Sequence, residues 1–131
     1  MEVLRTGALT PEQTTEVLAN IPREDAKDLL ARTHEYFIAQ DGETVLAYGG
    51  LISSTFLSPE VYVWLIAINR PSSRRKIISA LGLAQNYISS LGQRVFCEVF
   101  PTDRRGRHFA EVLGFKKILE LDDRNVFEWS K

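Results

Sequence analysis

The stretch of sequence that decides the fold is Val61-Tyr62-Val63-Trp64-Leu65-Ile66-Ala67-Ile68, followed by the basic turn Asn69-Arg70-Pro71-Ser72-Ser73-Arg74-Arg75-Lys76. The first eight residues form a continuous apolar, β-branched run, which is typical of a central strand covered on both faces. Pro71 ends that strand, and Ser72 or Ser73 can cap a helix directly after it. The sequence therefore predicts a buried strand that leads through a basic turn into a helix.

The helix after this turn is amphipathic and returns the chain to the sheet. Gly92 predicts its end, and the segment 94–100 is strand-like. A strand, a helix and a strand in this order imply a parallel pair joined by a right-handed crossover over 61–100. The apolar positions of the helix recur at steps of four and three residues: Ile77, Leu81, Ala84, Ile88 and Leu91.

Two helices and a β-hairpin are predicted before the central strand. The first helix is capped by Thr10 and ends near Asn20, and the second extends from Pro22 to Ala31. The segment from Glu35 to Ser54 predicts a hairpin with a two-residue turn at Asp41-Gly42.

A helix and a second hairpin are predicted after 94–100. Thr102 or Asp103 can cap this helix, which ends at Leu113 before Gly114. Strands at 115–121 and 125–129 follow, joined around Asp122-Asp123. The whole order predicts one α/β domain over residues 1–131, with a mostly antiparallel mixed sheet, one parallel pair and helices on both faces.

The composition excludes several classes of protein. With 131 residues, 44% of them hydrophobic and 25% charged, the chain is expected to form one globular core. The apolar run 61–68 is shorter than the roughly 20 residues that a membrane helix needs. No signal peptide is visible at Met1–Arg5, and a lone Cys97 forms no internal disulfide, so a cytoplasmic location is expected.

Positive charge gathers at two predicted helix starts, although the net charge is only −1. The amino end of a helix is already electropositive, so cations there are locally unfavourable unless an anion binds. In an open α/β sheet both starts would lie at the carboxyl ends of neighbouring strands, where ligands bind. The pattern favours a ligand with several phosphates, such as coenzyme A; a solvated surface patch is the alternative, because short basic runs usually lie on an exposed face. The residues concerned are Arg70, Arg74, Arg75, Lys76, Arg104, Arg105 and Arg107.

The stretch from Val99 to Phe115 ends in His108-Phe109-Ala110-Glu111-Val112-Leu113-Gly114-Phe115. It resembles the GNAT superfamily of acyltransferases, in which a strand leads into Asn-x-x-Ala and then Tyr-x-x-x-Gly-Phe. Asp103 stands at the family's Asn position and Gly106 at its small-residue position. The order of elements is similar to that of GNAT proteins over nearly the whole chain, and the basic turn is also similar to small GNAT-like proteins of T7-like bacteriophages.

This resemblance implies an acyl-CoA-dependent N-acetyltransferase with acetyl-CoA as its cofactor. The acceptor is then an amine of a protein or small molecule. For a phage-encoded chain it would be an amine of a host protein, in the host cytoplasm. No membrane partner is expected, and a homodimer is allowed for. A family member positions the reactants, polarises the thioester carbonyl with a strand amide and removes a proton.

The sequence departs from the family pattern at two places. Lys76 and Ile78 stand where the family's acyl-CoA loop has glycines, so side-chain charge would have to replace bare backbone amides. Ala110 stands where the family usually has a general-acid tyrosine. These departures favour, as the alternative, a GNAT-fold protein that binds a partner without catalysis. A nucleic-acid-binding module using the same arginines is a third hypothesis, which the net charge of −1 disfavours.

Glu98 is the predicted catalytic base, because it alternates with Phe96 and Phe100 on one strand face, where a carboxylate is costly unless used or paired. An open face or a partner arginine would explain it equally well. No metal-ligand spacing is present. The residues predicted to bind the cofactor are Ile66, Ala67, Ile68, Arg70, Arg74, Arg75, Lys76, Ile77, Arg105 and His108.

Three further side chains have more ordinary explanations. Glu60 could line the amine site, although its place before the central strand explains it as well. Tyr87 could replace the missing acid only if its helix lies near the thiol. Cys97 is expected to be a small hydrophobic residue of a buried strand rather than a nucleophile.

Overall fold

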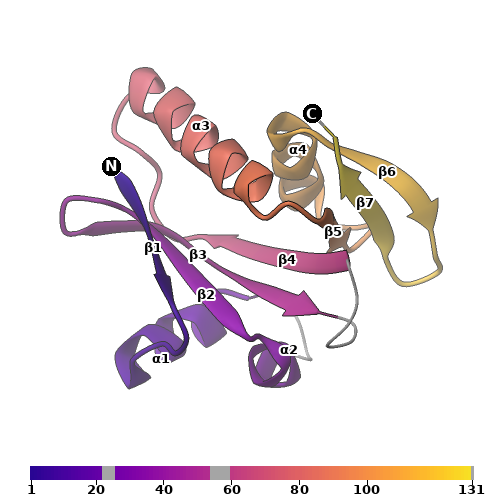
Figure 1. Ribbon diagram of the computed structural model, residues 1–131, viewed down its shortest axis with the longest axis horizontal. Helices are drawn as coiled ribbons and strands as arrows, with labels where there is room; N and C mark the ends of the chain where they lie inside the picture. Colours follow the sequence, from indigo (N-terminus) through magenta and orange to yellow (C-terminus); the bar gives the residue numbers. More distant parts are fainter. Residues whose placement is uncertain (22–25, 54–59, 131) are drawn as a thin grey trace.

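A seven-stranded mixed sheet, with the strand order β1-β2-β3-β4-β5-β7-β6, organises the chain in the computed structural model (Figure 1). The structure describes residues 1–21, 26–53 and 60–130. The predicted helix start at Pro22 and the predicted hairpin end at Ser54 lie outside these residues. None of the described helices has the length and apolarity needed to cross a membrane.

The predicted fold class is confirmed, because β4 and β5 are parallel and every other pair of neighbouring strands is antiparallel. The strands are β1 (Glu2–Thr6), β2 (Glu35–Asp41), β3 (Thr44–Ser53), β4 (Glu60–Ala67), β5 (Arg94–Val99), β6 (Phe115–Glu120) and β7 (Asn125–Trp129). The described helices are α1 (Pro11–Asn20), α2 (Ala26–Arg32), α3 (Arg74–Ser90) and α4 (Arg104–Leu113).

The first strand, β1, was not predicted from the sequence. It is only five residues long, and the charged side chains of Glu2 and Arg5 interrupt its apolar pattern. It forms because it pairs antiparallel with β2, from Glu2 opposite Gln40 to Thr6 opposite Tyr36. Such an edge strand depends on its neighbour for its hydrogen bonds, so local sequence carries little signal for it.

The predicted helix caps are confirmed, and the two open choices are resolved. Thr10 and Gln13 form a reciprocal capping box at the start of α1. Ser73, rather than Ser72, caps α3 by accepting the backbone N–H of Lys76. At α4 the cap is Asp103, whose carboxylate accepts the Gly106 N–H at 2.8 Å.

The turn of the first hairpin lies one residue later than predicted. Asp41 still pairs with Thr44, so the two loop residues are Gly42 and Glu43 rather than Asp41 and Gly42. Gly42 has a φ of +61°, a conformation that glycine adopts without steric cost. A register shift between Ala39 and Gln40, with Leu46 of β3 as the extra residue, precedes the turn.

The central strand β4 is covered on both faces, as its continuous apolar sequence predicts (Figure 1). Val63 belongs to a buried cluster that includes side chains of α3 and α4, among them Ile88. Trp64 points to the other face and packs in a cluster with α1 and α2, including Val17 and Leu29. The sheet therefore separates two cores, and the side chains of β4 alternate between them.

The close approach of the Phe37 ring on β2 to the Gly49 backbone on β3 predicts a mutational effect at Gly49. A Cβ atom at this position would lie 2.0 Å from Cζ of the buried Phe37 ring. We expect Gly49→Ala to lower the free energy of unfolding by about 1–3 kcal/mol, because the ring must move within a packed core. Urea denaturation followed by tryptophan fluorescence measures this change.

Gly82 in α3 is the matched control. A Cβ there meets nothing within 4 Å, so Gly82→Ala removes only the helix-destabilising effect of glycine. This variant should raise the free energy of unfolding by about 0.5–1 kcal/mol. Equal effects of the two substitutions would contradict the close contact between Gly49 and Phe37.

Candidate active site

The parallel pair at the centre of the sheet separates after three residues. Glu60, Val61 and Tyr62 pair with Arg94, Val95 and Phe96, and no pairing of β4 with β5 follows within the described strands. Beyond this point β4 remains paired with β3 as far as Ala67, while β5 pairs with β7 as far as Val99. A wedge-shaped gap therefore opens between the two strands toward their carboxyl ends. We call this gap the cleft.

The backbone of β4 presents amides to the cleft at alternate residues. Ile68 donates its N–H to the Leu46 carbonyl at 2.8 Å, so its backbone faces β3. Because hydrogen-bonded pairs alternate along an antiparallel ladder, the backbone of Ile66 also faces β3. The N–H groups of Leu65 and Ala67 then point away from β3, toward the cleft.

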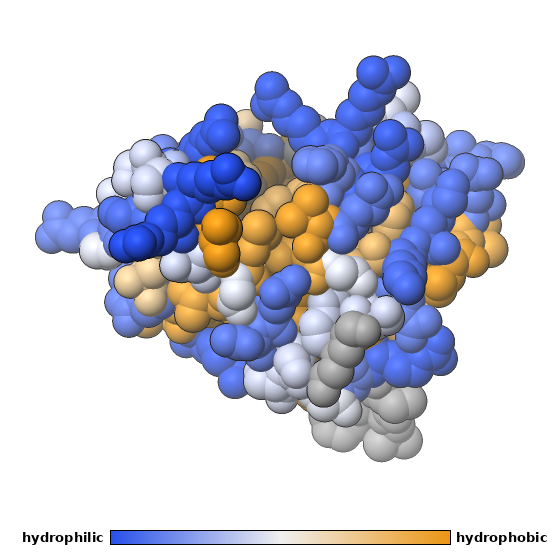
Figure 2. Space-filling model, turned by 90° about the horizontal axis from the view of Figure 1, so that it is seen from above, coloured by the Kyte–Doolittle hydropathy of each residue, from blue (hydrophilic) through white to orange (hydrophobic). Residues whose placement is uncertain are grey.

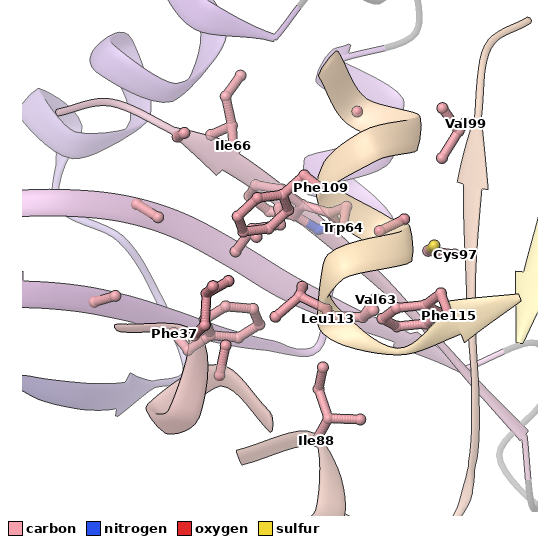
Figure 3. A pocket seen from close by; sticks show the side chains of 18 of the residues that line it. Phe37, Val63, Trp64, Ile66, Ile88, Cys97, Val99, Phe109, Leu113 and Phe115 are labelled. Atoms are coloured by element: carbon pink, nitrogen blue, oxygen red, sulfur yellow. The ribbon is translucent and has the colours of Figure 1, made fainter. Parts of the chain in front are cut away.

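The cleft belongs to a cavity of about 710 Å³ that is lined mainly by the sheet, α3 and α4, and also by residues of the opposite face such as Leu29 and Trp64. Figure 3 shows Val63 of β4, Cys97 and Val99 of β5, and Phe109 and Leu113 of α4 around the same space. From above, Figure 2 shows hydrophobic residues in the hollow on this face and hydrophilic residues around it. The candidate site is thus an apolar channel with a charged rim.

The starts of α3 and α4 border this one cavity, as the two basic clusters led us to expect. Pro71 and Ile77 line it at the start of α3, and Asp103 and Gly106 line it at the start of α4. The exposed side chains of Arg105 and His108 are not part of the lining among the described residues. The second cluster therefore contributes its helix end rather than these two side chains.

A shallow hollow lies directly at the start of α3. Arg70, Ser72, Ser73 and Arg74 line it, and both arginines are exposed. Lys76, also predicted to bind the cofactor, forms an ion pair with Asp41 of the first hairpin, with Nζ and Oδ2 2.8 Å apart. This pair lowers the pKa of Asp41, chiefly through the hydrogen bond. Arg75 is exposed and lines neither the hollow nor the cavity.

Glu98, the predicted base, lies on β5 where this strand borders the cleft. Cys97 and Val99 point toward α3 and α4, whereas Phe96 contacts Tyr62, so Glu98 lies on the opposite face of the sheet. It lines the cavity and is about a quarter exposed. Its partner among the described residues is Arg124 of the β6–β7 turn, at 3.3 Å between Nε and Oε2.

Two other candidates retain their protons at neutral pH. Burial, together with the nearby charge of Glu98, raises the pKa of the Cys97 thiol to about 12. Burial also raises the pKa of Tyr87, whose hydroxyl donates to Glu35 at 3.1 Å. Neither is activated as a nucleophile or placed as an acid at the cleft. Within the described ranges, no three metal-ligating side chains come together.

Three contributors to the site were missed by the sequence analysis. The Leu65 amide could not be found from the sequence, because the direction in which its N–H points depends on the β3–β4 register. Arg124 reaches Glu98 from a turn 26 residues away, without a local signal. Phe109 borders the cavity while 36% exposed, and its place in the quoted motif was its only signal.

Comparison with known proteins gives a clear result for structure and none for sequence. Neither a protein-family model nor a curated protein sequence matches this chain. Solved structures match over nearly its whole length, at sequence identities that support a shared fold alone.

Three of these structures illustrate the similarity. A protein assigned to the GNAT family of acetyltransferases, from Desulfovibrio desulfuricans, is 14% identical, with 96% of this chain and 97% of that chain covered and a TM-score of 0.66. An acetyltransferase from Bacillus subtilis in complex with CoA is 12% identical, with 99% of this chain and 98% of that chain covered and a TM-score of 0.66. A variant of spermidine N-acetyltransferase from Vibrio cholerae is 13% identical, with 98% of this chain and 94% of that chain covered and a TM-score of 0.64. The chain therefore has the GNAT fold.

The raised pKa of Cys97 predicts slow thiol labelling in the folded protein. At pH 8 a thiol with a pKa of about 12 is ionised in about one molecule in ten thousand, against about one in ten for the unshifted value of 9.0. We expect DTNB to react at least about 100-fold more slowly in buffer than in denaturing urea. Equal rates would show an accessible thiolate at the cleft and would reopen the nucleophile hypothesis.

Proposed function

We propose that this protein is an acyl-CoA-dependent N-acyltransferase that accepts acetyl-CoA and transfers its acyl group to an amine. The observation that carries the proposal is the separation of β4 from β5. It leaves strand amides facing an apolar channel whose outer end meets the start of α3. The shared fold with acetyltransferases, one of them in complex with CoA, supports the same function.

The side chains present fit the chemistry of coenzyme A. Its phosphates suit the start of α3, where the first backbone N–H groups of a helix and the guanidinium groups of Arg70 and Arg74 offer positive charge. Its pantetheine arm carries amides, which suit the backbone of Leu65 and Ala67. Arg75 and Lys76 flank the hollow and would add charge, although Lys76 would share its ammonium group with Asp41.

The chain's own groups supply positioning, charge stabilisation and a proton acceptor. When bound, an acyl-CoA supplies an activated thioester carbonyl. The N–H of Leu65 or Ala67 can donate to the carbonyl oxygen as negative charge develops on it. Glu98 can accept the proton of the attacking amine, directly or through a water molecule, as a C–N bond forms and the C–S bond breaks.

The absence of a tyrosine at position 110 is compatible with this reaction. Ala110 is buried in the wall of the cavity and offers no proton. A thiolate is a stable leaving group that needs little help from an acid, so the reaction would be slower rather than abolished. Of the three β4-side residues predicted to bind the cofactor, Ala67 keeps an amide that faces the cleft, whereas the Ile68 amide is already bonded to Leu46. Leu65 is the second proposed donor.

The acceptor we propose is an amine on a protein or a small molecule. Spermidine N-acetyltransferase has this fold and acts on a polyamine, which supports an amine acceptor in general. The central strand with its basic turn 69–76 resembles small GNAT-like proteins of T7-like bacteriophages, which motivates a narrower hypothesis. On that hypothesis the acceptor is a host protein and the reaction occurs in the host cytoplasm.

A binding module without catalysis is the second candidate. Ala110 in place of an acid and the engagement of Lys76 with Asp41 favour it. Such a module would bind a partner protein and leave it unmodified. Mass spectrometry of the recovered partner distinguishes the two, because only the enzyme adds an acyl group.

Charge at the start of α3 predicts the affinity for the coenzyme. Arg70 and Arg74 line the hollow, and Arg75 adjoins it, so the Arg74→Glu/Arg75→Glu variant places two carboxylates where phosphates are expected. Isothermal titration calorimetry should show binding of acetyl-CoA to the wild type and at least a tenfold weaker affinity for this variant.

A Lys116→Glu/Lys117→Glu variant on β6 is the control, since it makes the same change in net charge at the sheet edge. It should leave the affinity within about twofold of the wild type. No heat of binding with millimolar acetyl-CoA would overturn the proposed function.

The proposed base predicts a kinetic effect of Glu98→Gln. This substitution preserves shape but removes the proton acceptor, so turnover with a polyamine acceptor should fall about 10²- to 10⁴-fold. Coenzyme affinity should stay within about twofold, because the carboxylate lies on the face of the sheet opposite α3 and α4. Glu111→Gln, exposed on α4, is the control and should leave turnover unchanged. Equal turnover in Glu98→Gln and wild type would exclude this role for Glu98.

A further inference from the structure

The cavity continues beyond the cleft into a space beneath the second half of α3, which we call the inner chamber. Figure 3 shows Phe37, Val63 and Ile88 around this part of the pocket. The chamber is lined by Phe37, Val63, Leu81, Ala84, Tyr87 and Ile88. These side chains come from β2, β4 and α3, so the chamber lies between the helix and the sheet.

The inner chamber offers almost no polar groups to a ligand. The Tyr87 hydroxyl is the single polar side-chain atom among these six residues, and it donates to Glu35 at 3.1 Å. Arg5 also binds Glu35, which fixes the carboxylate on the far side of the ring. The ring of Tyr87 rests against Phe37, with centroids 4.7 Å apart. The chamber therefore presents hydrocarbon and aromatic surface.

The outer part of the same cavity is different in character. Its polar lining residues lie at the carboxyl ends of β4 and β5 or in the β6–β7 turn, and they include Asn69, Glu98, Thr102, Asp103 and Arg124. The cavity thus has polar lining residues at the carboxyl ends of β4 and β5 and an apolar lining beneath α3. Such a division fits a ligand with a polar head and a hydrocarbon tail.

The pantetheine arm of a coenzyme does not suit the inner chamber. Each of its amides would lose hydrogen bonds to water there and find no partner among the six lining side chains except the Tyr87 hydroxyl, which is unfavourable. The cleft beside Leu65 and Ala67 offers such partners. The arm therefore belongs in the cleft, and the chamber remains for another part of the ligand.

We propose that the inner chamber binds the hydrocarbon tail of an acyl group longer than acetyl, so that the preferred donor is a medium-chain acyl-CoA. This inference rests on the proposed function, which it deepens by naming the class of donor. An apolar cavity of about 150 Å³ is enough to bind benzene, and the whole cavity here has about 710 Å³. An acetyl group adds only two carbon atoms beyond the sulfur, whereas a longer acyl chain can extend from the cleft toward the residues beneath α3.

The effect of chain length on affinity should be large. Each methylene transferred from water to an apolar site stabilises binding by about 0.8 kcal/mol, or about fourfold in affinity. We expect octanoyl-CoA to bind at least tenfold more tightly than acetyl-CoA. Calorimetry with CoA, acetyl-CoA, butyryl-CoA and octanoyl-CoA measures this series below the micelle-forming range, without any acceptor or turnover.

A bulky side chain that fills the inner chamber should remove the preference for octanoyl-CoA over acetyl-CoA. Ala84→Phe adds a ring from α3 into the chamber, and it should weaken octanoyl-CoA at least tenfold while CoA and acetyl-CoA stay within about twofold. Asn86 is exposed on the same helix, so Asn86→Phe is the matched control and should bind the four ligands with wild-type affinities. Thermal unfolding of each variant establishes that it is folded before its affinities are compared.

The outcomes separate the two proposals. If neither CoA nor acetyl-CoA binds, the proposed function fails. If both bind and octanoyl-CoA binds no more tightly, the inner chamber does not hold the acyl tail and only this inference is overturned. A chain-length preference that survives in folded Ala84→Phe also overturns it, because the tail would then lie elsewhere. The wild-type series decides the question even if Ala84→Phe does not fold.

Discussion

The separation of β4 from β5 is the constraint on which the rest of this structure depends. Two strands that run parallel from Glu60 to Tyr62 then follow different partners, because β4 stays hydrogen-bonded to β3 and β5 to β7. The sheet becomes two halves joined at one end. Any strand edge that opens in this way exposes N–H and C=O groups, which are costly to leave unpaired away from water. A ligand with amides and a carbonyl can replace the missing ladder, so the break in the sheet is also the basis of its proposed function.

The alternation of side chains along β4 gives the two faces of the sheet separate tasks. Val63 and its neighbours on one face meet α3 and α4, where the cavity widens into apolar space. Trp64 on the other face is fixed by a hydrogen bond from its Nε1 to Thr33 at 2.9 Å and by packing against α1 and α2. The face that packs against α1 and α2 therefore holds β4 in place, and the face toward α3 and α4 borders the cavity. Glu98 of β5 lies on the same face as Trp64, opposite α3 and α4.

The charged side chains at the two helix starts do not all face the cavity, although the charge pattern of the sequence suggested a single binding site. In the first cluster, Arg70 and Arg74 border a hollow while Lys76 holds the first hairpin through Asp41. That ion pair ties the basic turn to the β2–β3 hairpin across 35 positions of sequence. In the second cluster the carboxylate of Asp103 caps α4 and offsets part of its positive end. The two helix starts share one cavity, but the first is better equipped to hold phosphates.

The sequence by itself determined the order of elements from α1 onward, the buried central strand, the crossover through α3 and the helix caps, because each rests on local signals such as periodicity and capping residues. It also indicated the GNAT fold through the motif ending at Phe115. Only the tertiary structure decided the rest. β1 exists through its pairing with β2, Glu98 meets Arg124 across a turn, and the amide that faces the cleft depends on a register with β3. These are relations between distant segments, and a hydrogen-bond direction or a cavity has no counterpart in the order of residues along one chain.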